Sequence, residues 1–186
     1  KMRAAGIRVP LIIDADSWGQ SSKNILEVGP KLLQADPEHN LMFSIHMWWP
    51  SERHDPKATG VETVEERVTQ VLEKSVELNL PLIVGEFAPV AVKGAKYIPY
   101  RHIMADAERL NIGWLAWSWG PGNFDSHDMH MTTPGSYNTL VAWGRFVCID
   151  SSLSIQNTSS IPSFILNGDF VTGSSGRASN LVQNGD

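Results

Sequence analysis

LPLIVGEFAPV, residues 80–90, is an apolar run with a single carboxylate, Glu86, near its carboxyl end. Continuous runs of this length without polar alternation are typical of strands that are covered on both faces, as in parallel sheets. In a parallel α/β barrel the reactive groups gather at the carboxyl ends of the strands, where the connecting loops converge. The role of Glu86 therefore depends on the side chains that the other strands carry at their ends.

Three similar apolar runs occur elsewhere in the chain, and helical patterns separate them. The runs are VPLIIDA (9–15), NLMFSIHM (40–47) and IGWLAWSW (112–119). Apolar residues recur near helical spacing in residues 24–35, 61–78 and 97–110, and a further helix is predicted at 136–149. Strands and helices in this alternation predict an α/β fold with a parallel sheet.

Each predicted strand ends in polar or aromatic side chains. These are Asp14, Asp16 and Trp18 after the first strand, His46, Trp48 and Trp49 after the second, Glu86 after the third, and Trp117 and Trp119 after the fourth. Indole rings stack on the apolar faces of pyranose sugars, and carboxylates accept hydrogen bonds from hydroxyls or attack the anomeric carbon. The pattern favours carbohydrate chemistry. Trp114 and Trp143 are predicted to pack in the core.

Composition and charge exclude several other function classes. The net charge is −5, from 15 basic and 20 acidic residues without a long run of either sign, which argues against nucleic acid or an anionic membrane as a partner. No apolar stretch approaches the roughly 20 residues of a membrane span. Cys148 is the only cysteine, which excludes an intrachain disulfide and a multi-cysteine metal site.

No cofactor and no metal ion are predicted. A doubly wound nucleotide-binding domain is disfavoured because no Gly-rich phosphate loop follows any of the strands. Five residues in two segments have side chains that can ligate a metal, but their spacing matches no ligand pattern. They are His54, His127, His130, Asp125 and Asp128. We expect these residues to lie in solvated loops.

Four of the motifs resemble those of glycoside hydrolase family 5. PLIVGEFAP is similar to the seventh strand of that family's barrel, in which the Glu after Gly is the nucleophile. FSIHMWWP resembles the sixth strand with its His-x-Tyr motif, and GWLAWSWGPGN resembles the eighth, whose Trp forms the floor of the cleavage subsite. LIIDADSWGQ is similar to the fifth strand, especially in bacterial β-mannanases. The resemblance extends from residue 9 to about residue 147, with the motifs in the family's order.

This resemblance implies a role for the residues at the strand ends. Glu86 is expected to be the catalytic nucleophile, Trp117 to stack against the sugar at the cleavage point, and His46 to bind substrate or tune the carboxylate. Trp48 stands where the family has Tyr, and an indole donates a hydrogen bond but does not accept one. Asp14 is expected to organise the mouth of its strand through hydrogen bonds. Three indoles are expected to be either sugar platforms or loop anchors: Trp18, Trp49 and Trp119. The candidate substrate-binding residues are His46, Trp48, Trp117, Trp18, Trp119 and Asp14.

Four strand–helix units are half of a (β/α)8 TIM barrel, which typically needs about 250 residues. We therefore predict that residues 1–149 form the C-terminal half of such a barrel, strands five to eight, and that the opening KMRAAGIRVP is the end of a helix entering the first strand. A Ser/Thr/Asn-rich linker is predicted at 150–163. Residues 164–186 resemble the start of a β-sandwich carbohydrate-binding module, and a polar linker with chance turns is the alternative.

The predicted function is that of a retaining endo-β-1,4-glycanase without a cofactor, with mannan as the first expected polysaccharide substrate and cellulose-type glucan as the second. Such an enzyme needs a second carboxyl group about 5–5.5 Å from the nucleophile. The resemblance places this acid/base Glu upstream of Lys1, in a missing N-terminal half-barrel. The alternative function is that of a non-catalytic polysaccharide-binding fragment or pseudoenzyme.

The resemblance also implies a secreted, extracellular protein. Half a barrel alone exposes two strand edges and an apolar interior. We therefore expect the isolated chain to aggregate or dimerise.

Overall fold

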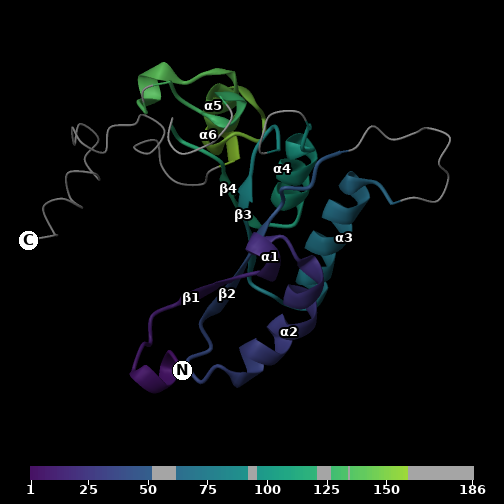
Figure 1. Cartoon of the computed structure of the whole chain (residues 1–186), viewed down its shortest axis with the longest axis vertical. Helices are drawn as coiled ribbons and strands as arrows, with labels where there is room; N and C mark the ends of the chain where they lie inside the picture. Colours follow the sequence, from purple (N-terminus) through teal and green to yellow (C-terminus); the bar gives the residue numbers. More distant parts are fainter. Residues whose placement is uncertain (52–61, 92–95, 121–126, 134, 159–186) are drawn as a thin grey trace, which may run out of the picture.

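The structure is a computed structural model that describes residues 1–51, 62–91, 96–120, 127–133 and 135–158. Its centre is one four-stranded parallel sheet in the order β1-β2-β3-β4 (Figure 1). The strands are β1 (Leu11–Asp14), β2 (Leu41–His46), β3 (Leu82–Phe87) and β4 (Gly113–Ala116). The α-helices are α1 (Asp16–Gly19), α2 (Ser22–Ala35), α3 (Val64–Glu77), α4 (Tyr100–Arg109), α5 (Ala142–Arg145) and α6 (Ile155–Thr158). The shorter turns are η1 (Arg3–Ala5), η2 (His127–Met129) and η3 (Tyr137–Thr139), of 3-10 type, and η4 (Phe146–Asp150), of π type.

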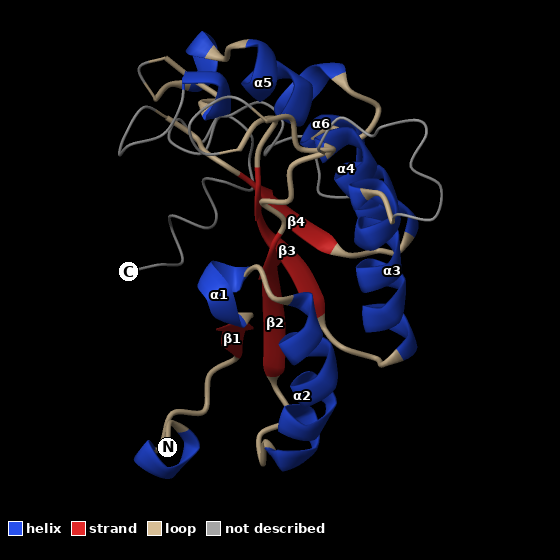
Figure 2. Ribbon diagram, turned by 45° about the vertical axis from the view of Figure 1, so that its right-hand side comes forward, coloured by secondary structure: helices blue, strands red, loops and turns tan. Residues whose placement is uncertain are grey.

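The hydrophobic core lies between the sheet and the helices that cover one of its faces. Figure 2 shows α2, α3 and α4 on the same side of the strands. Side chains of β2 and β3 that point to this side are fully buried; they are Phe43, Ile45, Val84 and Phe87. Buried residues at helical spacing on α3 and α4 belong to the same cluster; they include Val68, Leu72, Ile103 and Met104. Strand alternation and helical periodicity thus present two apolar surfaces to one another.

The start of α3 is specified by its own sequence. Thr63 accepts a hydrogen bond from the backbone N–H of Glu66 at 3.1 Å, and the Glu66 carboxylate accepts one from the backbone N–H of Thr63 at 2.7 Å. This capping box satisfies two backbone donors that would otherwise lack a partner at the helix terminus.

Among the helices of the described segments, none combines the length and the apolar character needed to cross a bilayer.

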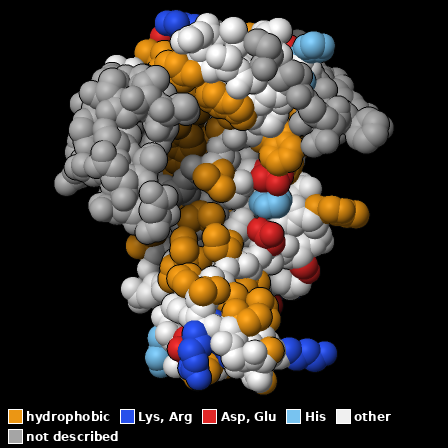
Figure 3. Space-filling model, turned by 90° about the vertical axis from the view of Figure 1, so that its left-hand side faces the viewer, with side chains coloured by type: hydrophobic (Ala, Val, Ile, Leu, Met, Phe, Trp, Pro, Cys, Tyr) orange, Lys and Arg blue, Asp and Glu red, His pale blue; other side chains and the backbone are white. Residues whose placement is uncertain are grey.

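The helices α2, α3 and α4 leave the second face of the sheet open. Ile12 on β1 is 58% exposed and Leu115 on β4 is 59% exposed, and burial alternates along both strands. The expectation that every strand is covered on both faces is therefore wrong for β1 and β4. The reason is that the large helices lie on one side, and each of these strands has one neighbouring strand within the described part of the chain. Figure 3 looks onto this face, where apolar side chains form a band.

The last predicted helix, 136–149, is broken into η3, α5 and η4. The backbone leaves the helical region at Leu140 and Val141, and the N–H of Val141 donates to the carbonyl of Met131 at 2.9 Å. A hydrogen bond to a different segment thus replaces a helical one. Gly144 then packs closely on the same segment, because a Cβ at this position would lie 2.1 Å from the Met131 carbonyl oxygen.

At both ends of the described chain, the structure differs in part from the sequence-based predictions. The predicted helix end at the start of the chain is the single 3-10 turn η1. The predicted linker begins with structure, because Ser154 is fully buried, its hydroxyl donates to the Ile149 carbonyl at 3.1 Å, and α6 follows it. The remainder of the linker and the predicted carbohydrate-binding segment, 159–186, lie outside the described residues. Cys148 is half-buried, and burial raises the pKa of its thiol.

Candidate active site

The carboxyl ends of the four strands surround a cavity of about 680 Å³. Six of the seven residues that the sequence singled out line it: Asp14, Trp18, His46, Trp48, Glu86 and Trp117. The other lining residues are Ala15, Gly19, Gln20, Pro50 and Ala91. The cavity therefore brings together side chains from all four strand ends, as the parallel arrangement predicted.

Backbone hydrogen bonds just beyond the strands hold the carboxyl ends of neighbouring strands together. Met47 donates its N–H to the Glu86 carbonyl at 2.8 Å, and Trp117 donates to the Phe87 carbonyl at 2.8 Å. On the other side, Ala15 donates to Ser44 at 2.9 Å. Residues that follow different strands are thereby held at one edge of the sheet.

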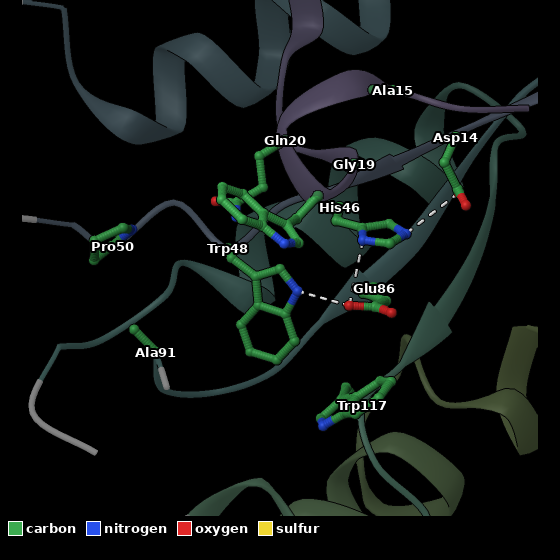
Figure 4. A pocket seen from close by; sticks show the side chains of 11 residues that line it. Asp14, Ala15, Gly19, Gln20, His46, Trp48, Pro50, Glu86, Ala91 and Trp117 are labelled. Carbon is green, nitrogen blue, oxygen red and sulfur yellow. Dashed lines mark hydrogen bonds and ion pairs between the residues drawn. The ribbon is translucent and has the colours of Figure 1, made fainter. Parts of the chain in front are cut away.

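Glu86 lies at the centre of the cavity, with two neighbours on the same carboxylate oxygen. Its Oε2 accepts a hydrogen bond from Trp48 Nε1 at 2.8 Å and lies 3.3 Å from His46 Nδ1 (Figure 4). Its Oε1 has no hydrogen-bond or ion-pair partner among the described residues. The side chain is 27% exposed. One oxygen is thus fixed by the protein, and the other is available to a ligand.

His46 lies between two carboxylates and close to two glycines. Its Nε2 lies 3.4 Å from Asp14 Oδ1, opposite the contact with Glu86. A Cβ on Gly19 would lie 2.4 Å from His46 Cγ, and a Cβ on Gly85 would lie 2.1 Å from Ser44 Oγ and 3.2 Å from His46 Cδ2. Only residues without a side chain fit at these two positions. Sequence reasoning missed both glycines; the available signal was their position next to Trp18 and Glu86 in the matched motifs.

Trp117 borders Glu86 on the side away from His46 (Figure 4). Its ring makes an edge-to-face contact with Trp48, with centroids 6.2 Å apart. Its backbone carbonyl accepts a hydrogen bond from Trp143 Nε1 at 2.9 Å, and Trp143 is buried, as predicted. The peptide bond between Trp117 and Ser118 is cis. Two indoles therefore form one wall of the cavity beside the free oxygen of Glu86.

The other tryptophans have distinct environments. Trp18 lines the cavity and is 88% exposed, whereas Trp49 is buried beneath the Arg67 guanidinium, 3.9 Å from its ring centroid. Trp49 is thus a loop anchor. Trp119 lies outside the cavity lining, and its indole donates to the Gly135 carbonyl at 2.9 Å. Trp114 packs against Phe87 in the core, with ring centroids 5.8 Å apart.

A second cavity of about 570 Å³ lies beside α4 and α5. It is lined in part by His127, Asp128 and His130, and the two imidazole rings make an edge-to-face contact at 5.6 Å. The other two candidate metal-ligating residues, His54 and Asp125, lie outside the described residues. Within the described segments, no three His, Cys, Asp or Glu side chains are grouped to hold a metal ion.

Comparisons with known proteins agree with this geometry. A family model described as "Cellulase (glycosyl hydrolase family 5)" matches residues 1–123. A mannan endo-1,4-beta-mannosidase of Cellvibrio japonicus is 31% identical over 86% of this chain and 34% of its own length. One of Salipaludibacillus agaradhaerens is 29% identical over 91% of this chain and 50% of its own length. The crystal structure of a β-mannanase from Streptomyces thermolilacinus with mannohexaose has a TM-score of 0.70 at 29% identity, over 87% of this chain and 49% of that one.

A parallel α/β sheet with a carboxylate and indoles at its carboxyl edge defines a barrel-type glycoside hydrolase site. The chain belongs to glycosyl hydrolase family 5, because the family model matches 123 of its 186 residues. It spans between a third and a half of the length of these two curated relatives. Its four strand–helix units form part of the TIM barrel of that family, which confirms the predicted fold class.

Proposed function

We propose that the chain carries the nucleophile half of a retaining endo-β-1,4-mannanase site, with Glu86 as the nucleophile. The observation that carries this proposal is the asymmetry of its carboxylate. Oε2 is bound by Trp48 and lies beside His46, while Oε1 has no partner among the described residues. A nucleophile needs one free oxygen and a fixed orientation toward the anomeric carbon.

The reaction follows from this arrangement. Oε1 of Glu86 attacks the anomeric carbon, the glycosidic C–O bond breaks, and the leaving oxygen takes a proton from a general acid. Water then attacks the glycosyl ester, returns the proton to that acid, and releases the sugar with its original configuration. Trp48 and His46 hold the carboxylate during both steps, and the ring of Trp117 provides an apolar surface for the sugar at the cleavage point.

Mannan is proposed as the substrate because of the relatives. Two curated relatives are mannan endo-1,4-beta-mannosidases, and one similar structure contains mannohexaose. The general acid, in this proposal, is a carboxyl group from a part of the barrel outside this sequence, since the chain spans about half of the similar structures. Secretion remains a prediction from the family resemblance.

The proposal is tested with an activated substrate whose leaving group needs no protonation. We expect 2-deoxy-2-fluoro-β-mannobiosyl fluoride to label the chain, because fluoride departs without acid assistance and the 2-fluoro group slows release of the glycosyl ester. Intact-mass spectrometry would show the addition of one mannobiosyl group, and peptide mapping would place it on Glu86. The matched gluco reagent tests whether glucan is accepted instead.

Glu86→Gln should abolish labelling, and Glu77→Gln should retain it, because Glu77 is an exposed carboxylate on α3 outside the cavity lining. A label on another residue would overturn the assignment of the nucleophile. If the chain binds manno-oligosaccharides but never acquires a label, the alternative of a non-catalytic binding protein holds instead.

A further inference from the structure

Trp143 is a buried residue on α5 that bonds to the wall of the active-site cavity, and the mechanism above does not use it. It is 6% exposed. Its indole Nε1 donates a hydrogen bond to the backbone carbonyl of Trp117 at 2.9 Å. Trp117 lines the cavity, whereas Trp143 is not among its lining residues. The bond therefore joins a residue of the core to the ring that faces the sugar in the proposed site.

The Trp117 carbonyl cannot form the next regular hydrogen bond between β3 and β4. Trp117 donates its own N–H to the Phe87 carbonyl, at the end of β3, at 2.8 Å. If this parallel ladder continued, the Trp117 carbonyl would accept from the residue two positions after Phe87, which is Pro89. Proline has no backbone N–H and cannot donate this bond. The indole of Trp143 supplies a donor in its place.

Aromatic packing fixes the ring of Trp143. It makes edge-to-face contacts with Phe87 and Tyr100, with centroids 6.1 and 5.1 Å apart, and it stacks on Phe146 at 6.3 Å with 12° between the planes. Aromatic pairs prefer distances in this range. Because the ring is already held by its neighbours, little side-chain entropy is lost when its N–H bonds Trp117.

Backbone hydrogen bonds tie both partners to one further segment. Met131 donates its N–H to the Ser118 carbonyl at 2.9 Å, and Val141 donates to the Met131 carbonyl at 2.9 Å. Ser118 directly follows Trp117, and Val141 directly precedes α5, which carries Trp143. The end of β4 and the start of α5 are thus fixed relative to one another, so the position of Trp117 depends on α5.

We propose that Trp143 is a positioning residue of the active site, which holds the Trp117 ring in the orientation that a bound sugar needs. The proposal rests on the proposed function, because it requires that Trp117 contact the sugar beside Glu86. Trp143 acts through the backbone of Trp117 and is not a catalytic residue. The proposal implies that loss of one N–H group in the core weakens sugar binding even when the packing of the core is kept.

The experiment replaces Trp143 by 3-benzothienylalanine, which keeps the shape of the ring and has sulfur in place of the indole N–H. The labelling rate of Glu86 in the full chain is measured against the concentration of the mannobiosyl fluoride. We expect the half-saturating concentration to rise about fivefold, the factor that corresponds to one neutral hydrogen bond. The same replacement at Trp114 is the matched control, because that indole packs on Phe87 and makes no hydrogen bond within the described residues.

Two further variants separate positioning from a general effect on stability. In a Trp117→Ala background the replacement at position 143 should cause no further rise, because its effect passes through the Trp117 ring. Val147→Ala removes fully buried methyl groups shortly after α5 and leaves the Trp143 bond in place. It should unfold at a lower urea concentration and keep the half-saturating concentration of wild type.

The outcomes distinguish this proposal from the proposed function. If wild-type protein is labelled at Glu86 and the replacement at position 143 leaves the half-saturating concentration unchanged, the positioning role is wrong and the proposed function stands. If the rise is equally large in the Trp117→Ala background, Trp143 does not act through Trp117 and the proposal is also wrong. If wild-type protein is never labelled, both proposals fail.

Discussion

Four neighbours lie close to the His46 ring and restrict its orientation. Asp14 and Glu86 lie beside its two nitrogens, and Gly19 and Gly85 lie against the ring. Since the Glu86 carboxylate shares Oε2 between His46 and Trp48, a displaced imidazole also alters the environment of the proposed nucleophile. Residues around the imidazole therefore also affect the geometry of the proposed nucleophile.

Gly19→Ala should damage both stability and the site. The added Cβ would lie 2.4 Å from His46 Cγ, and Gly19 has φ +80°. We expect a loss of about 1–2 kcal/mol from the left-handed backbone, and about 1–3 kcal/mol more from the overpacking. Urea unfolding measures the loss, and the fluorosugar labelling rate of Glu86 should fall with it.

Gly6→Ala is the matched control, because Gly6 has φ +84° but nothing within 4 Å of a Cβ. It should show the backbone loss alone and label at the wild-type rate. Equal stability losses for the two variants would mean that Gly19 does not press on His46.

Trp48 should act as a hydrogen-bond donor to Glu86. Trp48→Phe keeps an aromatic ring but removes the 2.8 Å bond to Oε2, so we expect the labelling rate to fall about tenfold, in line with about 1.5 kcal/mol for a bond to a charged group. Trp48→Tyr should keep most of the rate at pH 8. Above about pH 10 a phenol ionises whereas an indole does not, so the Trp48→Tyr variant alone should lose rate there. Unchanged labelling in Trp48→Phe would assign the indole to sugar contact only.

The strand-end pattern was enough to predict which residues share the cavity. A carboxylate or indole that follows a parallel strand must lie at one edge of the sheet, so Glu86, His46 and Trp117 could be grouped from spacing alone. The glycines around His46 could not, because their role depends on loop φ angles and on a 2–3 Å approach between segments distant in sequence. Whether Trp18 or Trp119 lines the cavity was likewise undecided, since the sequence does not fix loop direction.

At the scale of elements, Arg3 joins the first turn to the connection between α2 and β2. Its guanidinium donates to both oxygens of Asp36, at 2.7 and 3.1 Å, and to the Ile7 and Val9 carbonyls, each at 2.9 Å. Asp36 follows the last residue of α2 and also accepts from the Asn40 N–H at 3.1 Å. This bidentate pair holds residues 1–10 against the amino-terminal end of the sheet.

The pair predicts a specific acid sensitivity. Hydrogen bonding to Arg3 lowers the pKa of Asp36 from its ordinary 3.8 to about 2. A carboxyl with a depressed pKa stabilises the fold fully above about pH 4, and this contribution is lost as the pH falls toward about 2. We expect Arg3→Gln to lower the thermal midpoint at pH 6 and to flatten its dependence on pH between 4 and 2.

Arg8→Gln is the control for this prediction. Arg8 pairs with Glu38 at the surface and its side chain is 75% exposed, so it should contribute little. Parallel acid curves for wild type and Arg3→Gln, measured by circular dichroism, would contradict the assigned role of the pair.

The periodicity of the sequence predicted the type of each element more reliably than its length. The patterns predicted β2, β3, α2 and α3 because these segments pack through their own apolar residues. β4 ends at Ala116 instead of at residue 119, and the last helix is broken, because Ser118 and Val141 form backbone hydrogen bonds with the segment around Met131. Such pairings join distant parts of the chain and leave no local signal in the sequence.

At the scale of the molecule, helices α2, α3 and α4 cover one face of the sheet and leave the other face open. The open face carries Ile12 and Leu115 at its edges and bears the cavity at its carboxyl end. Parallel sheets are normally covered on both faces, and an uncovered edge strand is a template for pairing. In a complete barrel this face is the interior, which packed side chains fill.

The chain by itself should therefore self-associate through the open face. At micromolar concentrations we expect sedimentation velocity to show species heavier than the 20.6 kDa monomer. The double variant Ile12→Lys and Leu115→Lys should shift the population toward monomer, because burying lysine ammonium groups in an apolar interface is unfavourable. Val76→Lys, at a 47% exposed position on α3, places the same charge on the covered side and should leave association unchanged. A wild-type chain that sediments as a monomer and unfolds cooperatively would contradict the prediction, and equal effects of both substitutions would locate the contact elsewhere.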